Sequence, residues 1–324
     1  MPPQRVRMLD YVSSVMQRII AEVDRVAPAD LSVLITGETG VGKEVVAREI
    51  ASKSVRRGQA FIKINSAAIP DRLLESELFG YQRGAFTGAD GNKRGRVQEA
   101  HRGTLFFDEI SELDRNSQGK LLHMIQEGEF IPLGCNEPIS VDVRILAATN
   151  KDLTSEVEKG TFRKDLFYRL NVVHIRIPPL RERKEDIPKF VEFFIEKYMH
   201  HFGKTHFPTV TSEQLRLMGA YDWPGNVREL ENFVKNLVLF EDTVSSFENL
   251  HDRAKKHLAK TKTKLSLVDI GRMAEEEMER KVISRILKQN GWNRKKTALM
   301  LQISYRSLLS KIKKFEIGKA GTNS

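Results

Sequence analysis

The segment GETGVGKE, at residues 37–44, follows a short apolar run and precedes a helix-forming stretch. Its pattern, G-x-x-x-x-G-K, is typical of a loop whose backbone N–H groups surround phosphate oxygens. The next helix adds positive potential at its N-terminus, and the lysine reaches the β- and γ-phosphates. We therefore expect this loop to bind ATP through eight residues: Gly37, Glu38, Thr39, Gly40, Val41, Gly42, Lys43 and Glu44.

Asp108 ends the apolar run TLFFD at residues 104–108, and Glu109 follows it directly. We expect Asp108 to hold a hydrated Mg²⁺ through water and Glu109 to polarise the water that attacks ATP. Glu44 stands where many phosphate loops carry Ser or Thr, whose hydroxyl binds Mg²⁺, so magnesium must depend more on other ligands or on water. The alternative is a pair of surface acids at a strand end, which the phosphate loop disfavours.

Two further polar residues, Asn65 and Asn150, also end apolar runs. Ligands of open α/β sheets bind outside the carboxyl ends of the strands. We therefore expect both asparagines to lie near Lys43, Asp108 and Glu109.

The elements that must position these residues alternate between strand and helix. Apolar runs at 32–36, 61–65, 104–108, 143–148 and 172–177 predict buried strands, and helical spacing predicts helices over 8–26, 43–53 and 116–128. This alternation predicts an α/β fold with a parallel sheet over residues 1–183. Residues 184–250 predict a helical subdomain with helices over 186–201, 212–221 and 226–240, and residues 251–269 predict a basic linker.

Residues 270–324 predict an all-α unit. Helices are expected over 274–290, 294–301 and 304–315, with Asn293 as an N-cap, and the last two form a helix-turn-helix. Leu308, Ile312 and Phe315 share one face of the last helix, and the opposite face is basic. We expect DNA contacts from eight residues of this unit: Arg294, Lys295, Tyr305, Arg306, Ser310, Lys311, Lys313 and Lys314. A helical dimerisation tail is the alternative, but it would not predict the basic face.

Charge is unevenly spread along the chain. Residues 251–324 contain 19 Lys and Arg against 7 Asp and Glu, a net charge of +12, whereas the other 250 residues carry a net charge of −2. A neutral body with a basic C-terminal part indicates nucleic acid as a partner, although a solvated basic extension is the plainer explanation.

Composition excludes some classes of protein. No apolar run approaches the ~20 residues that span a bilayer, so we expect no membrane association. The single cysteine, Cys135, excludes an internal disulfide framework and suits a cytoplasmic protein. His200, His201 and His206 lack a Cys or acidic partner at ligand spacing, which favours a polar loop between lid helices over a metal site.

Five motifs occur in a fixed order: GETGVGKE, GAFTGA at 84–89, GTLFFDEI, FRKDLFYRLN at 162–171 and WPGNVREL at 223–230. Together they resemble the AAA+ ATPase domain of the sigma-54-dependent transcriptional activators, or bacterial enhancer-binding proteins, over roughly residues 8–240. Glutamate at the position of Glu44 is usual in that family. The C-terminal unit is similar to the family's Fis-type DNA-binding domain, although its turn reads LQIS, with Gln302 in place of glycine.

The resemblance implies roles for individual residues. Asn65 would pair with Glu109 and switch with nucleotide state, Asn150 would be sensor I and Arg228 sensor II. Arg163 and Arg169 would be arginine fingers that reach the γ-phosphate of a neighbouring copy, where an arginine neutralises transition-state charge. The alternative for these two arginines is a set of surface salt bridges.

The GAFTGA segment would be the contact with the sigma-54 factor, through six residues: Gly84, Ala85, Phe86, Thr87, Gly88 and Ala89. The glycines would let the loop change conformation with nucleotide state. In one nucleotide state Phe86 could instead fold back as a plug.

The function that the resemblance implies is an ATP-driven activator. It would bind double-stranded enhancer DNA, assemble from dimers into a ring expected to be a hexamer, and remodel the closed complex of sigma-54 and RNA polymerase. Because the ATPase module begins almost at Met1, either the chain is truncated or the protein is controlled otherwise, by expression, a partner protein or assembly. Phosphorelay control through a receiver domain is not expected. The alternative is a DNA-binding repressor that keeps the nucleotide fold only for oligomerisation.

Overall fold

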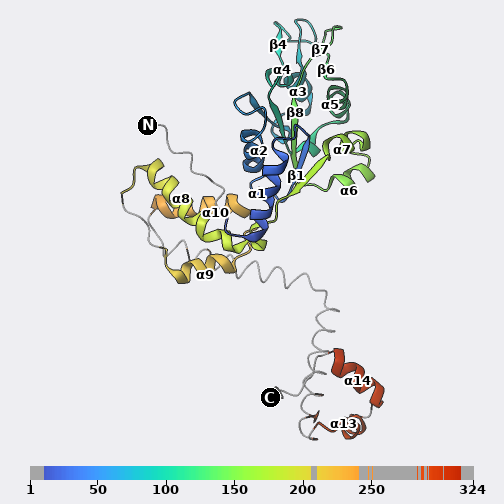
Figure 1. The fold of residues 1–324 in the computed structure, drawn as a ribbon, viewed down its shortest axis with the longest axis vertical. Coiled ribbons are helices and arrows are strands. Elements are labelled where there is room, and N and C mark those ends of the chain that lie inside the picture. Colours follow the sequence, from blue (N-terminus) through green and yellow to red (C-terminus); the bar gives the residue numbers. More distant parts are fainter. Residues whose placement is uncertain are drawn as a thin grey trace. The chain divides into compact units, whose positions relative to one another are not determined.

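The computed structural model describes most of the chain, namely residues 11–205, 210–240, 247, 250, 283, 286, 287, 290, 292–301 and 303–314. The chain divides into two compact units, Met1–His251 and Asp252–Ser324, each described here by itself (Figure 1). The predicted linker over 251–269 lies outside the described residues.

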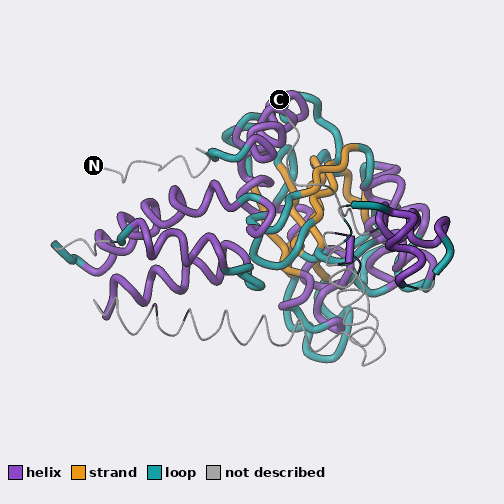
Figure 2. The backbone as a smooth tube through the Cα atoms, turned by 90° about the horizontal axis from the view of Figure 1, so that it is seen from below, coloured by secondary structure: helices purple, strands orange, loops and turns teal. Residues whose placement is uncertain are grey.

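A parallel sheet of five strands forms the centre of the first unit. Its strands are β1 (Val33–Thr36), β2 (Phe61–Asn65), β5 (Thr104–Asp108), β8 (Arg144–Thr149) and β9 (Val173–Arg176). They lie in the order β2-β5-β8-β1-β9, and every neighbouring pair is parallel. Figure 2 draws the strands in orange and the helices around them in purple. The predicted parallel α/β fold and its five strands are confirmed.

Helices cover both faces of this sheet because successive strand residues point to opposite sides. In β5, Phe106 packs with α1 (Ser14–Val26) and α2 (Lys43–Ser52), whereas Leu105 and Phe107 pack on the other face. That second face is covered by α3 (Asp71–Phe79), α5 (Arg115–Glu127), α6 (Leu153–Glu158) and α7 (Lys164–Leu170). The result is a three-layer unit with the strand ends free to carry the site.

The prediction of a helix from residue 8 is wrong at its start, since residues 11–13 are not helical and α1 begins at Ser14. Ser13 is the N-cap, and its Oγ accepts from the backbone N–H of Met16. Asp186 accepts hydrogen bonds from the backbone N–H groups of Val12 (2.7 Å) and Ser13 (2.8 Å). These bonds fix an extended entry into the helix.

Two short β-hairpins were not predicted. One pairs β3 (Gly80–Tyr81) with β4 (Lys93–Arg94), and the other pairs β6 (Glu129–Phe130) with β7 (Ile139–Ser140). Both lie at the same end of the first unit, drawn at the top of Figure 1, and α4 (Arg96–Glu99) follows the first of them. Short 3₁₀ turns complete the connections: η1 (Ser66–Ala68), η2 (Ile110–Glu112), η3 (Leu180–Glu182) and η4 (Lys184–Asp186).

Three longer helices form the helical part of the first unit: α8 (Ile187–Phe202), α9 (Ser212–Ala220) and α10 (Asn226–Phe240). They match the predicted helices to within one or two residues. Trp223 is buried, and its indole N–H donates to the Met218 carbonyl at 2.8 Å. The WPGN turn is thereby fixed at the start of α10.

In the second unit, α13 (Arg294–Met300) and α14 (Tyr305–Lys314) form the predicted helix-turn-helix. Asn293 caps α13 by accepting from the Lys296 N–H. Leu308 is fully buried in a small core that also contains Leu287 and Ala298. The predicted helix over 274–290 lies mostly outside the described residues, as does Gln302.

Candidate functional site

The phosphate loop connects the end of β1 to the start of α2. Gly42 has a φ of +105°, a left-handed conformation that disfavours any side chain at this position. The next residue, Lys43, is only 6% exposed and donates to the Gly37 carbonyl at 2.9 Å. Its ammonium nitrogen also lies 3.2 Å from a carboxylate oxygen of Glu109.

Glu109 joins the phosphate loop to the predicted sensor Asn150. The Asn150 backbone N–H donates to Glu109 Oε2, and the Asn150 amide donates to Thr39 Oγ1, each at 2.9 Å. The carboxyl ends of β1, β5 and β8 therefore bring together Lys43, Glu109 and Asn150, as the sequence predicted.

Asn65 lies at the same edge, in register with Asp108 of the adjacent strand. Its side chain is exposed, and no hydrogen bond joins it to another described residue. Glu109 is bonded to Lys43 and Asn150 instead. The pairing of Asn65 with Glu109 in another nucleotide state stays a prediction.

Lys63 of β2 was missed by the sequence analysis. Its ammonium contacts Glu44 Oε2 at 2.6 Å and Asp108 Oδ2 at 2.9 Å. Burial raises the pKa of Glu44, but hydrogen bonds from Lys63 and Arg48 leave it below its ordinary value. Burial likewise lowers the pKa of Lys63, but its bonds to Glu44 and Asp108 leave it raised. Both groups are therefore charged at neutral pH, and the signal was a lysine within the apolar run FIKIN.

The fit of this edge to magnesium is limited. Within the described part of the chain, no group of three or more His, Cys, Asp and Glu residues could hold a metal ion. Magnesium is commonly held by one or two carboxylates together with substrate phosphates. Asp108 fits that role as a single carboxylate ligand, directly or through water.

The helical part contacts the phosphate loop through Asn226. This buried residue has a φ of +54°, which asparagine tolerates better than most residues. Its amide nitrogen donates to Glu38 Oε2 (3.1 Å) and to the Thr39 carbonyl (3.0 Å), and its oxygen accepts from Leu180 N–H at 2.8 Å. One side chain thus connects the phosphate loop, η3 and α10.

Two arginines strengthen this connection. Arg181 makes a two-pronged pair with Glu38 at 2.6 and 2.9 Å, and this hydrogen bonding holds the pKa of Glu38 below its usual value. Arg183 is fully buried and donates to the Val41 carbonyl at 2.7 Å. Neither arginine was predicted, since both partners lie more than a hundred residues earlier in the chain.

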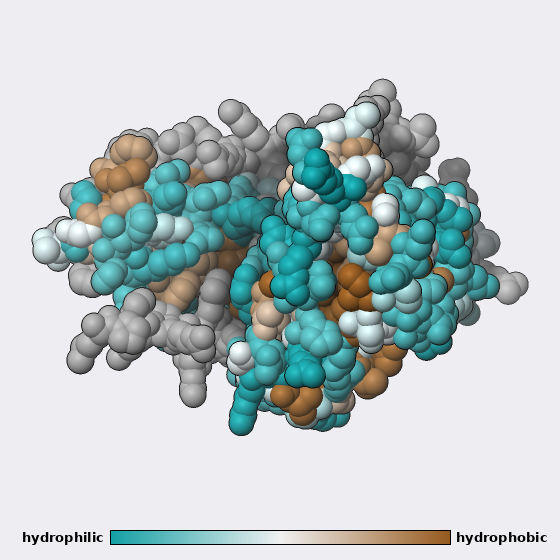
Figure 3. Space-filling view, turned by 90° about the horizontal axis from the view of Figure 1, so that it is seen from above, coloured by the Kyte–Doolittle hydropathy of each residue, from teal (hydrophilic) through white to brown (hydrophobic). Residues whose placement is uncertain are grey.

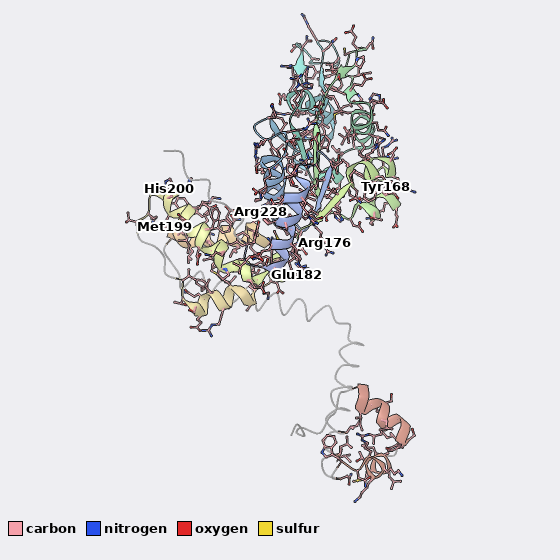
Figure 4. The ribbon with its side chains drawn as sticks, in the orientation of Figure 1. Tyr168, Arg176, Glu182, Met199, His200 and Arg228 are labelled. Atoms are coloured by element: carbon pink, nitrogen blue, oxygen red, sulfur yellow. The ribbon has the colours of Figure 1, made fainter. Side chains whose placement is uncertain are left out.

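Arg228, the predicted sensor II residue, lies near the start of α10 where the helical part meets the α/β part (Figure 4). Its backbone N–H donates to the Gly40 carbonyl at 3.3 Å, and its side chain is exposed. A Cβ on Gly40 would lie only 2.4 Å from the Gly225 carbonyl oxygen, so the loop and this turn touch backbone to backbone.

The predicted arginine fingers lie on or beside α7, away from the helical part. Figure 4 shows Tyr168 of α7 on the opposite side of the α/β part from α8. Arg163 pairs with Asp165 at 2.8 Å and lines a cavity of about 340 Å³ with α5, while Arg169 is exposed. No bond among the described residues joins either guanidinium to the phosphate loop of the same chain.

His200 and His201 lie in the last turn of α8, not in a loop, and Figure 4 shows His200 at the end of the helix remote from Arg228. His206 lies outside the described residues.

The loop over residues 84–89 lies between β3 and β4 and does not line the phosphate site. Gly84 N–H donates to the Ala89 carbonyl at 2.9 Å, which closes the loop on itself. Phe86 is 40% exposed and packs edge-on against Tyr81, with 5.0 Å between ring centroids. It is therefore neither fully extended nor buried as a plug.

The second hairpin supports this loop. Gln82 N–H donates to the Leu133 carbonyl and Leu133 N–H to the Gly80 carbonyl, each at 3.0 Å. Phe86 and Ile131 are both partly exposed, and the view from above in Figure 3 shows small apolar areas within a mostly hydrophilic surface. The two hairpins thus form one platform that presents an apolar tip.

The predicted DNA-contact residues are described in part. Arg294, Lys295, Tyr305 and Ser310 are exposed, and Lys311 is half-buried and has an interaction partner. The side chains of Arg306, Lys313 and Lys314 lie outside the described part of the structure. Their DNA contacts stay predictions.

Comparison with known proteins identifies three parts of the chain. The Sigma-54 interaction domain matches residues 9–176, the AAA+ ATPase lid domain matches 181–266, and the Fis family of bacterial regulatory proteins matches 275–315. Within the described part of the chain, no helix is long and apolar enough to cross a membrane.

Individual relatives agree with these matches. The chain is 44% identical over 307 residues to the Nif-specific regulatory protein of Azotobacter vinelandii, covering 93% of this chain and 58% of that protein. It is 41% identical over 312 residues to the regulatory protein AtoC of Escherichia coli, covering 95% and 68%. The chain therefore spans little more than half the length of the first relative and about two thirds of the second.

Solved structures support the fold. NtrX from Brucella abortus in complex with ADP has a TM-score of 0.70 at 31% identity, covering 94% of this chain and 69% of that one. Hsp104 of S. cerevisiae in a casein complex has a TM-score of 0.52 at 18% identity, covering 72% and 46%, which shows a shared fold alone. Since the Sigma-54 interaction domain alone accounts for more than half of the residues, this chain belongs to the sigma-54-dependent transcriptional regulators.

Proposed function

We propose that this protein is an ATP-driven activator that binds upstream enhancer DNA, assembles into a ring and opens the sigma-54 RNA polymerase promoter complex. The observation that carries the proposal is the arrangement of Lys43, Glu109 and Asn150 around the phosphate loop. Nucleotide binding is further supported by the structure of NtrX with ADP.

Each residue has a defined task in the proposed reaction. Lys43 moves from Glu109 to the β- and γ-phosphates when ATP enters, which frees the Glu109 carboxylate to orient and polarise water. A bound Mg²⁺ would neutralise phosphate charge, and Asp108 would hold it. Arg163 and Arg169 of a neighbouring copy would stabilise the transition state, which agrees with the lack of any bond, among the described residues, from either guanidinium to the phosphate loop of its own chain.

The remodelling role falls to residues 84–89, whose loop stands on the hairpin platform outside the nucleotide site. We expect Phe86 and Thr87 to contact the sigma factor. The separation of this loop from the phosphate site makes the two activities separable by mutation.

The test compares hydrolysis with promoter opening. Lys43→Ala and Glu109→Gln should lower ATP hydrolysis by at least about 100-fold. Thr87→Ala should keep most hydrolysis but lose open complexes on a sigma-54 promoter with a suitable enhancer. A parent protein that hydrolyses ATP yet never yields open complexes would contradict the activator role.

A DNA-binding repressor is the competing function. It would need the AAA+ fold for assembly but not its catalytic residues. Equal basal hydrolysis in the parent and in Lys43→Ala, combined with unchanged enhancer binding, would favour the repressor.

A further inference from the structure

The ammonium of Lys63 lies between two carboxylates of the nucleotide site. It contacts Glu44 at 2.6 Å and Asp108 at 2.9 Å, and all three side chains are between 21% and 36% exposed. Asp108 is the carboxylate expected to hold magnesium, and Glu44 occupies the position at which other phosphate loops place a magnesium-binding hydroxyl. A side-chain cation therefore sits beside both groups on the metal side of the site.

The alternation of β2 explains why Lys63 points there. Ile62 and Ile64 pack into the core on one face of the sheet, so Phe61 and Lys63 face α2 on the other. Glu44 lies in the first turn of that helix, and its other oxygen accepts a hydrogen bond from Arg48 at 2.7 Å. Both oxygens of Glu44 are thereby engaged by cations of the chain.

We propose that the positive charge of Lys63 keeps free divalent cations away from Glu44 and Asp108. Metal would then enter the site only together with nucleotide. Without Lys63, two carboxylates would converge on one point, which is the oxygen-rich, negative environment that divalent cations prefer. With Lys63 in place, a cation must displace an ion pair unless phosphates supply further ligands. Only the second half of this proposal, entry with nucleotide, rests on the proposed function.

The experiment measures Mn²⁺ binding to the full chain without nucleotide, by the paramagnetic resonance signal of free Mn²⁺. Manganese accepts the same oxygen ligands as magnesium. Lys63→Met should bind Mn²⁺ at least about fivefold more tightly than the parent, because a nearby positive charge is removed. Lys63→Arg should stay close to the parent, and Lys63→Gln replaces Lys63→Met if the latter does not fold.

Two controls locate the effect. Lys189 forms an ion pair with Glu192 at 3.0 Å in α8, so Lys189→Met removes the same charge but leaves one carboxylate rather than two. It should change Mn²⁺ affinity less than twofold. Asp108→Asn in the Lys63→Met background should return the affinity to the parent value.

Unchanged Mn²⁺ affinity in Lys63→Met, an equal gain in Lys189→Met, or a gain that survives Asp108→Asn would each overturn the proposal. A parallel titration with ATP separates it from the proposed function. A protein that never binds ATP contradicts the proposed function, whereas the Mn²⁺ comparison without nucleotide still decides the role of Lys63.

Discussion

Asn226 shows at the residue scale how one side chain can connect two parts of a fold. Its side-chain amide donates hydrogen bonds to Glu38 and Thr39 and accepts one from Leu180, and its backbone has a left-handed conformation. We expect Asn226→Ala to lower the free energy of unfolding by about 2–4 kcal/mol, because it strains the backbone and leaves the buried Leu180 N–H without an acceptor. Urea unfolding measures this loss.

Asn226→Gly separates the two causes. Glycine tolerates the positive φ but still removes the hydrogen bonds, so its destabilisation should be smaller than that of alanine. Equal stability of Asn226→Ala and the parent would show that the side chain does not hold the loop.

The Arg181–Glu38 pair gives a pH prediction. The pKa of Glu38 is lowered in the folded state, so the pair stabilises the protein above the ordinary glutamate pKa of about 4.3 and loses this effect as the pH falls through the folded value. We expect Glu38→Gln to be less stable than the parent at pH 7, and the difference to shrink near pH 3. The effect on stability should be small, since both side chains are about 40% exposed and the ion pair is screened by water. A stability difference between Glu38→Gln and the parent that does not change with pH would contradict this prediction.

Glu109 and Asn150 could be placed from the sequence because each comes at the end of an apolar run, and the carboxyl ends of parallel strands meet at one edge. Lys43 could be placed because it ends the glycine-rich pattern that follows the first apolar run. Arg181 and Asn226 could not, because their partner Glu38 lies 143 and 188 residues away and no local pattern encodes such a pairing. The role of Lys63 could not be predicted from its position in the apolar run alone, because it also depends on the face of the sheet to which β2 directs this side chain.

At the element scale, the two hairpins make a prediction about the 84–89 loop. Gly134 has a φ of +73°, and a Cβ there would lie 2.7 Å from the Ala85 Cβ. Gly160 has the same φ of +73° with nothing within 4 Å, so it is a matched control. We expect Gly134→Ala to lose promoter opening while keeping ATP hydrolysis, because it pushes the loop off its support.

Gly160→Ala should carry only the cost of the backbone conformation, about 1 kcal/mol, with promoter opening retained. Open-complex formation and urea unfolding of both variants decide this. Loss of opening in both would mean that backbone strain in general, and not the contact with Ala85, disturbs the protein.

These hairpins also mark the limit of prediction for elements. The five sheet strands and the helices α1, α2, α5, α8, α9 and α10 follow from apolar runs and helical spacing, whereas α3, α4, α6 and α7 were not predicted. The hairpin strands have two residues each, too few for any periodicity to appear. Their pairing depends on the backbone bonds to Leu133, which are contacts between distant segments.

At the scale of the whole molecule, the position of α7 on the side of the α/β part opposite α8 supports the proposal of a catalytic site shared between copies. Lys43→Ala and Arg163→Ala should each abolish hydrolysis alone, since one would remove the phosphate contact and the other the arginine that we propose to act in trans. Mixing the two variants in equal amounts should restore activity to roughly a quarter of the parent, because a head-to-tail ring then contains some interfaces with both intact residues. Arg57→Ala, a variant of a surface arginine, serves as the control in the same mixture.

No recovery on mixing would mean that the arginine acts within its own chain or that every interface must be intact. Titrating the mixing ratio distinguishes these outcomes. If every interface must be intact, adding a small share of either variant to the parent protein should cause a steep loss of ATP hydrolysis. If the arginine acts within its own chain, the loss should be proportional to the share added.

The junction of α3 with the first hairpin has a mechanical consequence. A Cβ on Gly80 would lie 2.3 Å from the Lys93 carbonyl oxygen, and a Cβ on Gly95 would lie 2.4 Å from the Leu78 carbonyl oxygen. The end of α3 and the first hairpin are therefore in direct backbone contact. The nine residues of α3 span about 13 Å, and a rotation of about 10° at its N-terminal end, close after Asn65, moves its far end by about 2 Å. A rotation of this kind would make α3 a lever arm, because a small change near Asn65 would become a larger displacement of the hairpin that carries residues 84–89.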